Sequence, residues 1–229
     1  MNITWLGHST FLFEIGQRQT ALIDPWLEGN PKAPKDFTLP KIDLMLLSHG
    51  HGDHTGDAIS IARKNNCPVI CNFEISLWLA AKGITKTCPM NKGGAQTVNG
   101  VSVTMTHAFH SSSMQDGDRI VYGGEAAGYI IEIPDGRRIY FAGDTAVFGD
   151  MRLIARLYEP DLAILPIGDL FTMGPKEAAI AVEFLGAKKV IPMHFGTFPP
   201  LTGTPEALRE LVGSDVEVID LDPGKPYAY

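Results

Sequence analysis

The stretch LLSHGHGDHTG, residues 46–56, places an unusual density of polar side chains directly after an apolar run. Four of these side chains can bind a metal ion: His49, His51, Asp53 and His54. In an extended loop, residues two apart point the same way, so His49 and His51 can reach one ion. Asp53 and His54 turn at the start of the following helix, toward a neighbouring point. The spacing therefore predicts a loop that supplies donors for two adjacent metal ions.

Composition narrows the class of protein. The chain has 229 residues, 45% of them hydrophobic and 20% charged, which predicts one globular domain over residues 1–229. Lys and Arg total 19 against 26 Asp and Glu, and no basic run occurs, so nucleic acid is not an expected partner. The N-terminus lacks a signal-like pattern and no apolar stretch reaches 18 residues, so we expect no membrane insertion. With three cysteines expected to be reduced, the sequence favours a cytoplasmic protein.

Hydrophobic periodicity predicts alternating strands and helices. The expected strands cover residues 2–6, 10–15, 20–24, 43–48, 68–72, 162–166, 189–193 and 216–220, with hairpins over 95–108 and 128–144. The expected helices cover residues 56–65, 74–83, 147–157, 175–185 and 204–212. Two sheet-rich blocks, each followed by helices, predict an α/β fold, a four-layer αββα sandwich.

Three further donors each follow an apolar run of the later chain: His110, Asp144 and His194. Open sheets bind ligands beyond the carboxyl ends of their strands, so we expect these residues to join the early loop in one site. Taken singly, a strand-end histidine is more often structural and an aspartate in a Gly-Asp-Thr turn is usually a cap. The complete set favours ligands, because a two-metal site needs about seven donors. His107, three residues before His110, is expected to face elsewhere.

This donor order resembles that of the metallo-β-lactamase superfamily of binuclear hydrolases. The stretches WLGHSTFLFE, HAFHSSS, YGG, FAGDT and PMHFGTFPPL are similar to those of a group of metal-dependent hydrolases related to ascorbate-6-phosphate lactonases. The resemblance implies that one ion is held by His49, His51 and His110. It implies that the other ion is held by Asp53, His54 and His194, with Asp144 bridging the two. A hydroxide between the ions would be the nucleophile.

The expected cofactor is a pair of divalent metal ions. Nitrogen and carboxylate donors suit Zn best, and Mn, Fe, Co and Ni are compatible with them. The expected reaction is hydrolysis of an ester-like bond, with Asp53 orienting the hydroxide or protonating the leaving group. Two bound ions would make the pocket positive, so the expected substrate is a small anion, a phosphorylated lactone or a phosphodiester. The sequence does not fix the oligomeric state, and a homo-oligomer is compatible with it.

Five residues beside the donors carry weaker predictions. His8 is either a structural histidine or a catalytic residue at the rim, and the resemblance favours the rim. Asp24 either hydrogen-bonds the ligand loop or caps a turn before proline. Ser111, with the serines and glycines that follow it, predicts a mobile loop over the site or a solvated surface. Phe195 and Phe198 are candidates for an apolar wall that contacts substrate.

Other classes of function are compatible with the same fold. A nuclease or RNA-processing enzyme is one, although the acidic chain has no room for an inserted nucleic-acid domain. A redox di-iron protein is another, although that branch has a carboxylate where His51 stands. A metal sensor or scaffold is a third, although closed structural sites favour cysteine ligands, and none lies near the donors.

Overall fold

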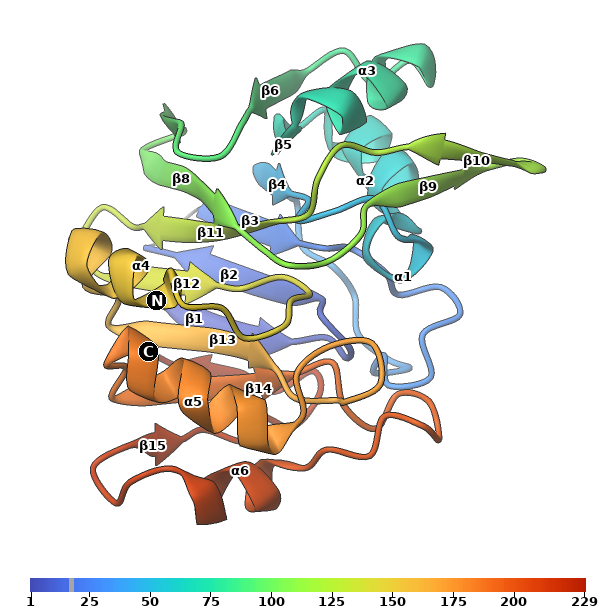
Figure 1. Cartoon of the computed structure of the whole chain (residues 1–229). Coiled ribbons are helices and arrows are strands. Elements are labelled where there is room, and N and C mark those ends of the chain that lie inside the picture. Colours follow the sequence, from blue (N-terminus) through green and yellow to red (C-terminus); the bar gives the residue numbers. More distant parts are fainter. Residues whose placement is uncertain (17–18) are drawn as a thin grey trace. The chain divides into compact units, whose positions relative to one another are not determined.

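The computed structural model describes residues 1–16 and 19–229, and the chain divides into two compact units. The first unit comprises Met1–Asn91, Ser111–Ala126 and Leu221–Tyr229, and the second comprises Lys92–His110 and Ala127–Asp220. Each unit contains one seven-stranded mixed sheet (Figure 1). The assignment of residues 1–229 to a single domain stays a prediction.

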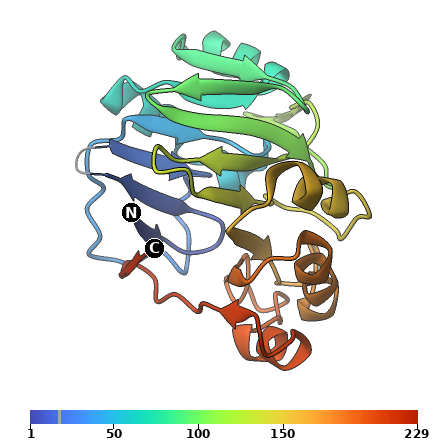
Figure 2. The same ribbon diagram turned by 90° about the vertical axis from the view of Figure 1, so that its left-hand side faces the viewer.

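The sheet of the first unit has the order β16-β1-β2-β3-β4-β5-β6. Its strands are β1 (Asn2–Trp5), β2 (Phe11–Ile15), β3 (Gln19–Ile23), β4 (Leu44–Leu46), β5 (Val69–Asn72), β6 (Thr87–Met90) and β16 (Pro226–Ala228). The first three strands form the predicted antiparallel meander, and β3 to β6 run parallel. The C-terminal strand β16 lies antiparallel beside β1, so both chain ends belong to this unit (Figure 2).

The helices of the first unit cover one face of its sheet. They are α1 (Gly52–Thr55), α2 (Ala58–Asn65) and α3 (Phe73–Ala81). The apolar side of α2 packs into a cluster with Leu22 and Met45 of the sheet, as its helical periodicity predicts. The Asn72 side chain caps α3 by accepting a hydrogen bond from the backbone N–H of Ile75. A two-stranded hairpin of β9 (Ser113–Asp116) and β10 (Arg119–Tyr122) completes the unit.

The sheet of the second unit has the order β15-β14-β13-β12-β11-β8-β7. Its strands are β7 (Ala95–Val98), β8 (Val101–His107), β11 (Ala127–Glu132), β12 (Arg138–Phe141), β13 (Leu162–Pro166), β14 (Lys189–Met193) and β15 (Glu217–Val218). Strands β7, β8, β11 and β12 are antiparallel, and β12 to β15 are parallel. The helices α4 (Met151–Tyr158), α5 (Pro175–Leu185) and α6 (Pro205–Leu211) pack against this sheet in one apolar cluster.

Strand direction gathers the predicted donors within each unit. In the first unit, Asp24 and the 48–54 loop follow the adjacent parallel strands β3 and β4. In the second unit, β8, β12 and β14 all end at the same edge of the sheet, and His110, Asp144 and His194 follow these ends. This edge is where open sheets bind ligands.

The mixed α/β class with two large sheets is confirmed, and most predicted elements occur within a few residues of their predicted bounds. The helix predicted over 147–157 begins only at Met151, because Gly149 disfavours helix. Strands β6, β9, β10 and β16 were not predicted. The segment after Ser111, which was expected to be a loop, folds into the β9–β10 hairpin, and its mobility stays a prediction. Among the described helices the longest, α5, has 11 residues, too few to cross a bilayer.

Candidate metal centre

The loop between β4 and α2 positions its side chains through tight backbone contacts. The carbonyl oxygen of His51 accepts from the N–H groups of His54 and Thr55, both at 3.0 Å, which starts the short helix α1. A Cβ on Gly50 would lie 2.5 Å from Cγ of Met114, so a larger residue there would force the β9–β10 hairpin to shift. The loop is therefore held by packing against the β9–β10 hairpin as well as by its own hydrogen bonds.

His49 and His51 direct ring nitrogens at each other, as their spacing predicts. Nε2 of His49 lies 3.0 Å from Nδ1 of His51, and the rings meet edge to face. Two ligands at 2.0–2.1 Å from a tetrahedral Zn ion are separated by about 3.3 Å, so this pair already has nearly the spacing of two metal ligands. The second nitrogen of His51 lies 3.2 Å from Oγ of Ser111.

Asp24 sets the protonation of the ligand histidines. This fully buried carboxylate accepts from the backbone N–H of Ser48 (2.7 Å), from the Ser48 hydroxyl and from Nδ1 of His54 (2.8 Å). Because the Ser48 hydroxyl donates its only proton to Asp24, it accepts from Nδ1 of His49 at 2.9 Å. These hydrogen bonds favour the tautomer with the proton on Nδ1 in both imidazoles, in which Nε2 is the nitrogen that can bind a metal. Asp24, His49 and His54 offer ligand atoms within 4.8 Å of one another.

Burial raises the pKa of the Asp24 carboxyl above its ordinary value, and the His54 and Ser48 hydrogen bonds oppose this shift. Its backbone also has a positive φ of 46°, a strained conformation for a residue other than glycine. The hydroxyl of Thr10 holds this turn by donating to the Asp24 carbonyl at 2.7 Å. These contacts place Asp24 among the residues that support the ligand loop.

His8 contacts the predicted catalytic aspartate. Its Nε2 lies 3.0 Å from Oδ2 of Asp53, the His8 ring is fully buried, and the Asp53 side chain is one-third exposed. The His8 backbone has φ of 54°, and its carbonyl accepts from the indole N–H of Trp5. The His8 and Trp26 rings meet edge to face, with their centroids 5.2 Å apart. His8 is thus held by backbone and ring contacts, and its Nε2 faces Asp53.

The second unit brings the three later donors together around one oxygen. Oδ2 of Asp144 lies 3.0 Å from Nε2 of His194 and 3.7 Å from Nε2 of His110. Asp144 and His194 are buried, whereas His110 is partly exposed. A carboxylate oxygen between two imidazole nitrogens is the arrangement that a shared ligand requires. The structure thus groups these three residues as the sequence predicts.

Close backbone packing fixes His194. Its φ is 57°, and a Cβ on Gly168 would lie only 1.9 Å from the His194 carbonyl oxygen. Thr145, next to Asp144, accepts from the N–H of Phe109 at 3.0 Å, and its carbonyl accepts from the N–H of Met173. The loops after β8, β12 and β13 are therefore tied to one another.

The remaining predicted residues occupy different positions. His107 interacts with Lys92 at 2.9 Å and with Phe109, so it belongs to a different contact from the donors. Phe195 is half-buried against the core of the second unit, and Phe198 is 40% exposed. Ser48 was missed as a site residue, although its place directly before His49 is a signal that could have revealed it. Ser112, which accepts from the N–H of Gly50, was treated only as part of a polar loop.

A sequence profile of the beta-lactamase superfamily domain matches residues 19–195. The chain belongs to this superfamily. A UPF0173 metal-dependent hydrolase of Solibacter usitatus is 56% identical over 227 residues, which cover 99% of both chains. A UPF0173 metal-dependent hydrolase of Archaeoglobus fulgidus is 46% identical and covers 100% of this chain and 99% of its own. The protein is thus a metal-dependent hydrolase of the metallo-β-lactamase superfamily, and the family assignment from the donor motif is confirmed.

Solved structures of superfamily members agree with this fold. Igni18, a metallo hydrolase from Ignicoccus hospitalis, matches with a TM-score of 0.86 and 34% identity over 99% of this chain and 97% of its own. The metallo-β-lactamase fold protein YhfI from Bacillus subtilis matches with a TM-score of 0.72 and 18% identity over 99% and 98%. At that identity the likeness to YhfI concerns the fold alone.

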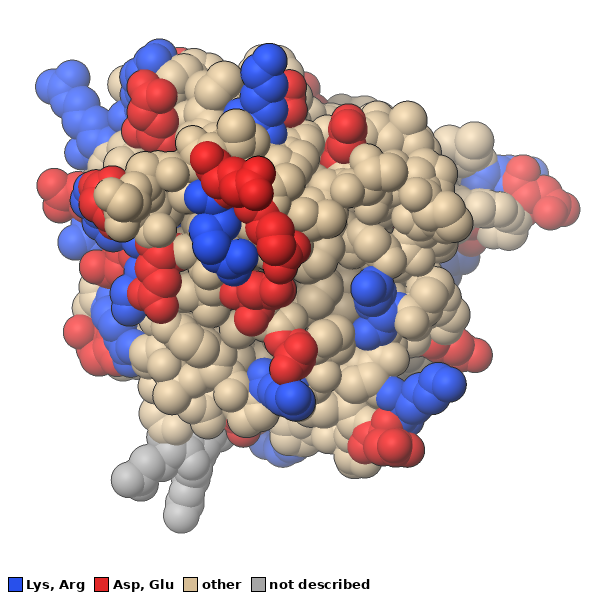
Figure 3. Space-filling view, turned by 90° about the horizontal axis from the view of Figure 1, so that it is seen from below, with Lys and Arg blue, Asp and Glu red and all other residues tan. Residues whose placement is uncertain are grey.

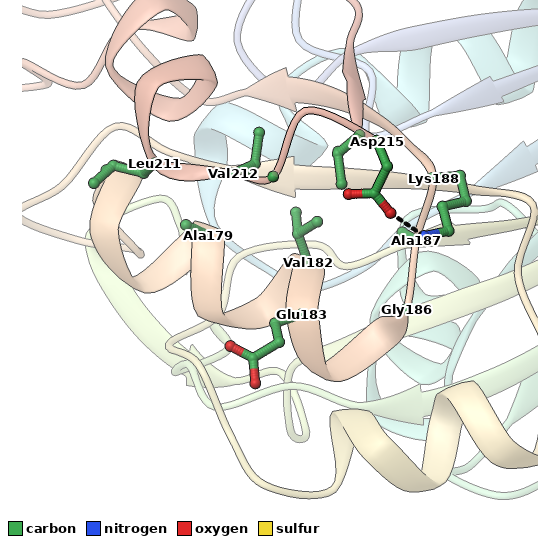
Figure 4. A pocket seen from close by; sticks show the side chains of 11 residues that line it. Ala179, Val182, Glu183, Gly186, Ala187, Lys188, Leu211, Val212 and Asp215 are labelled. Atoms are coloured by element: carbon green, nitrogen blue, oxygen red, sulfur yellow. Dashed lines mark hydrogen bonds and ion pairs between the residues drawn. The ribbon is translucent and has the colours of Figure 1, made fainter.

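A buried cysteine, a surface hollow and the surface charges of this protein do not contribute to the predicted metal site. Burial raises the pKa of the Cys71 thiol to about 12, so it is not a ready thiolate nucleophile. A surface hollow of about 320 Å³ in the second unit lies between α5, the end of α6 and the segment before β15, and it contains the Lys188–Asp215 ion pair (Figure 4). None of the predicted donors lines it. On the molecular face of Figure 3, the described acidic and basic side chains lie interspersed, without a continuous basic patch.

Proposed function

We propose that the seven donors together hold two divalent metal ions and that this centre hydrolyses an ester-like bond. The observation that carries the proposal is the hydrogen bonding of His49 and His54. Asp24 and Ser48 contact Nδ1 of His54 and His49, so Nε2 of each ring is the nitrogen that would bind a metal.

The donor set fits divalent ions. Five neutral imidazoles and two carboxylates suit Zn, and the same donors accept Mn, Fe, Co or Ni. The His49–His51 pair and His110 would hold one ion, and Asp53, His54 and His194 the other. Asp144 would bridge them, in keeping with its central Oδ2 between two histidines of the second unit. When bound, the ions supply Lewis acidity and bring the pKa of water near neutrality.

The residues of this chain would handle the protons and the orientation. In hydrolysis, the oxygen of water joins the acyl or phosphoryl centre and a proton passes to the leaving oxygen. The partly exposed Asp53 can accept a proton from water and return it to the leaving group. His8 fixes the Asp53 carboxylate by its hydrogen bond and is a positioning residue in this scheme. Two ions among these donors leave net positive charge, so we propose a phosphorylated lactone or a phosphodiester as substrate.

Elemental analysis of protein purified without added metal, followed by a panel of phosphodiesters, phosphonates and lactones, tests this proposal. His51→Ala and Asp144→Ala should abolish metal-dependent turnover and lower the metal content. His107→Ala is the matched control, because His107 bonds to Lys92 and should leave both quantities unchanged. Turnover that persists in either donor variant with its sites empty of metal would disprove the proposal.

A further inference from the structure

Four exposed apolar side chains lie on loops of the second unit that follow strands beside the predicted donors. Phe109 is 57% exposed, Leu170 60%, Phe171 64% and Phe198 40%. Each lies on a loop that follows β8, β13 or β14, the strands whose ends surround Asp144. We call these four residues the apolar rim. Large apolar side chains grouped on loops that carry ligands mark a surface that contacts a binding partner or substrate.

The loop that carries Leu170 and Phe171 is fixed at both ends next to the donors. At its start, Gly168 touches the carbonyl of His194. At its end, Met173 is buried in the core and donates its N–H to Thr145, the neighbour of Asp144. One end of the loop thus contacts the predicted ligand His194, and the other end contacts Thr145, the neighbour of the predicted ligand Asp144.

The tip of this loop has a strained backbone. Asp169 and Leu170 have φ values of 69° and 58°, two successive left-handed residues without a glycine. The Asp169 carboxylate accepts from the N–H of Leu170 at 2.7 Å, and the N–H of Asp169 donates to the Met173 carbonyl at 3.0 Å. Such strain persists only where surrounding contacts enforce it. The Leu170 and Phe171 side chains at this tip are exposed to solvent.

Charge on the same loops points to the chemistry of the ligand. The segments 108–110, 142–150, 167–174 and 194–204 contain no Lys or Arg, and their only acidic residue besides the donor Asp144 and the helix-flanking Asp150 is Asp169. A loop set without cationic side chains cannot recognise a second anionic group by ion pairing. It can recognise an aromatic ring or a branched alkyl chain by burial.

We propose that the apolar rim is the specificity surface of the active site and takes an uncharged aryl or branched alkyl group that flanks the bond to be cleaved. This inference rests on the proposed function and narrows its substrate class. The reacting ester, lactone or phosphodiester group faces the donors, and the group beside it contacts Leu170 and Phe171. A substrate with a carboxylate or a second phosphate in that place is disfavoured.

The test compares substrates that differ only in this group. Within the substrate class that shows turnover, methyl, phenyl and carboxymethyl members with the same leaving group are assayed for kcat/KM. The phenyl member should exceed the methyl member roughly tenfold, in line with the discrimination that apolar pockets achieve. The double variant Leu170→Asn, Phe171→Asn should remove this ratio with unchanged metal content. Leu157→Asn, at a residue 65% exposed on α4, is the control and should retain it.

Binding of phenylphosphonate and methylphosphonate to the metal-loaded protein, measured by calorimetry, separates this inference from the hydrolase proposal. Tighter binding of phenylphosphonate by the wild type that is lost in the double variant supports the rim proposal. The same binding result in a protein that shows no turnover refutes only the hydrolase proposal. Turnover without a phenyl preference refutes only the rim. The rim proposal is also overturned if the two phosphonates bind equally or do not bind. It is likewise overturned if the carboxymethyl substrate is preferred, or if the double variant changes only the oligomeric state.

Discussion

Replacement of Asp24 by asparagine tests whether a buried carboxylate controls metal binding through histidine protonation. Asparagine has the same shape, and its carbonyl oxygen can keep the 2.7 Å hydrogen bond from the Ser48 N–H. Its amide group replaces the oxygen that accepts from the Ser48 hydroxyl and from Nδ1 of His54. An amide donates, so His54 must turn to the tautomer with its proton on Nε2, the nitrogen that the metal needs.

The structure gives the expected size of the effect. The variant exchanges two charge-assisted hydrogen bonds for neutral ones, but it also removes the cost of burying a charge, the cause that raises the pKa of Asp24, so the unfolding free energy of the metal-free protein should change little. Metal affinity should fall roughly 10- to 100-fold, as it does when outer partners of ligand histidines are replaced. The larger effect on affinity follows because binding must also reverse the tautomer of His54.

Calorimetric titration of metal into the metal-free protein, together with denaturant unfolding, measures both quantities. Asp57→Asn is the matched control, because Asp57 also accepts from two backbone N–H groups, those of Leu27 and Glu28, but contacts none of the donors. Asp57→Asn should lower stability and leave metal affinity unchanged. Wild-type metal affinity in Asp24→Asn, or an equal loss in both variants, would refute the reasoning.

Three further predictions concern packing, orientation and the ions. Gly168→Ala should cost about 1–3 kcal/mol of unfolding free energy because its Cβ would clash with the His194 carbonyl oxygen. Gly149→Ala is the control, because its Cβ would meet no atom within 4 Å. Equal unfolding midpoints in the two variants would contradict this prediction. His8→Phe should lower kcat roughly 10- to 100-fold by releasing Asp53, and His8→Gln, which keeps a donor, should restore part of it; no difference between the two would count against a positioning role. Chelation should lower the unfolding free energy by about 2.7 kcal/mol for each bound ion, relative to protein with metal at 100 times its Kd, and an unchanged melting temperature would argue against tight sites.

The sequence predicts the ligand loop well because its information is local. The offsets between His49, His51, Asp53 and His54 fix which side chains share a side of the turn, whatever surrounds them. The later donors are predictable for a related reason, since each follows a strand whose position in the sequence the periodicity reveals. Within the second unit, Oδ2 of Asp144 indeed lies near both histidines.

Contacts between distant segments are beyond such reasoning. Asp24 and Ser48 lie 24 positions apart, and only the pairing of β3 with β4 brings their side chains together. The β9–β10 hairpin was missed because its strands are short and lie in a polar, glycine-containing segment. Its packing against Gly50 is a tertiary contact, which the local sequence does not reveal. Strand β6 contains Pro89, which lowers strand propensity, and it forms as an edge partner of β5.

The central proposal is that the seven predicted donors hold a pair of divalent ions. Anomalous X-ray diffraction at the absorption edge of the bound metal tests it most directly. The account predicts two peaks about 3.5–4 Å apart, one at His49, His51 and His110 and one at Asp53, His54 and His194, with Asp144 between them. A single peak, or peaks that leave Asp144 and His194 without metal, would contradict it.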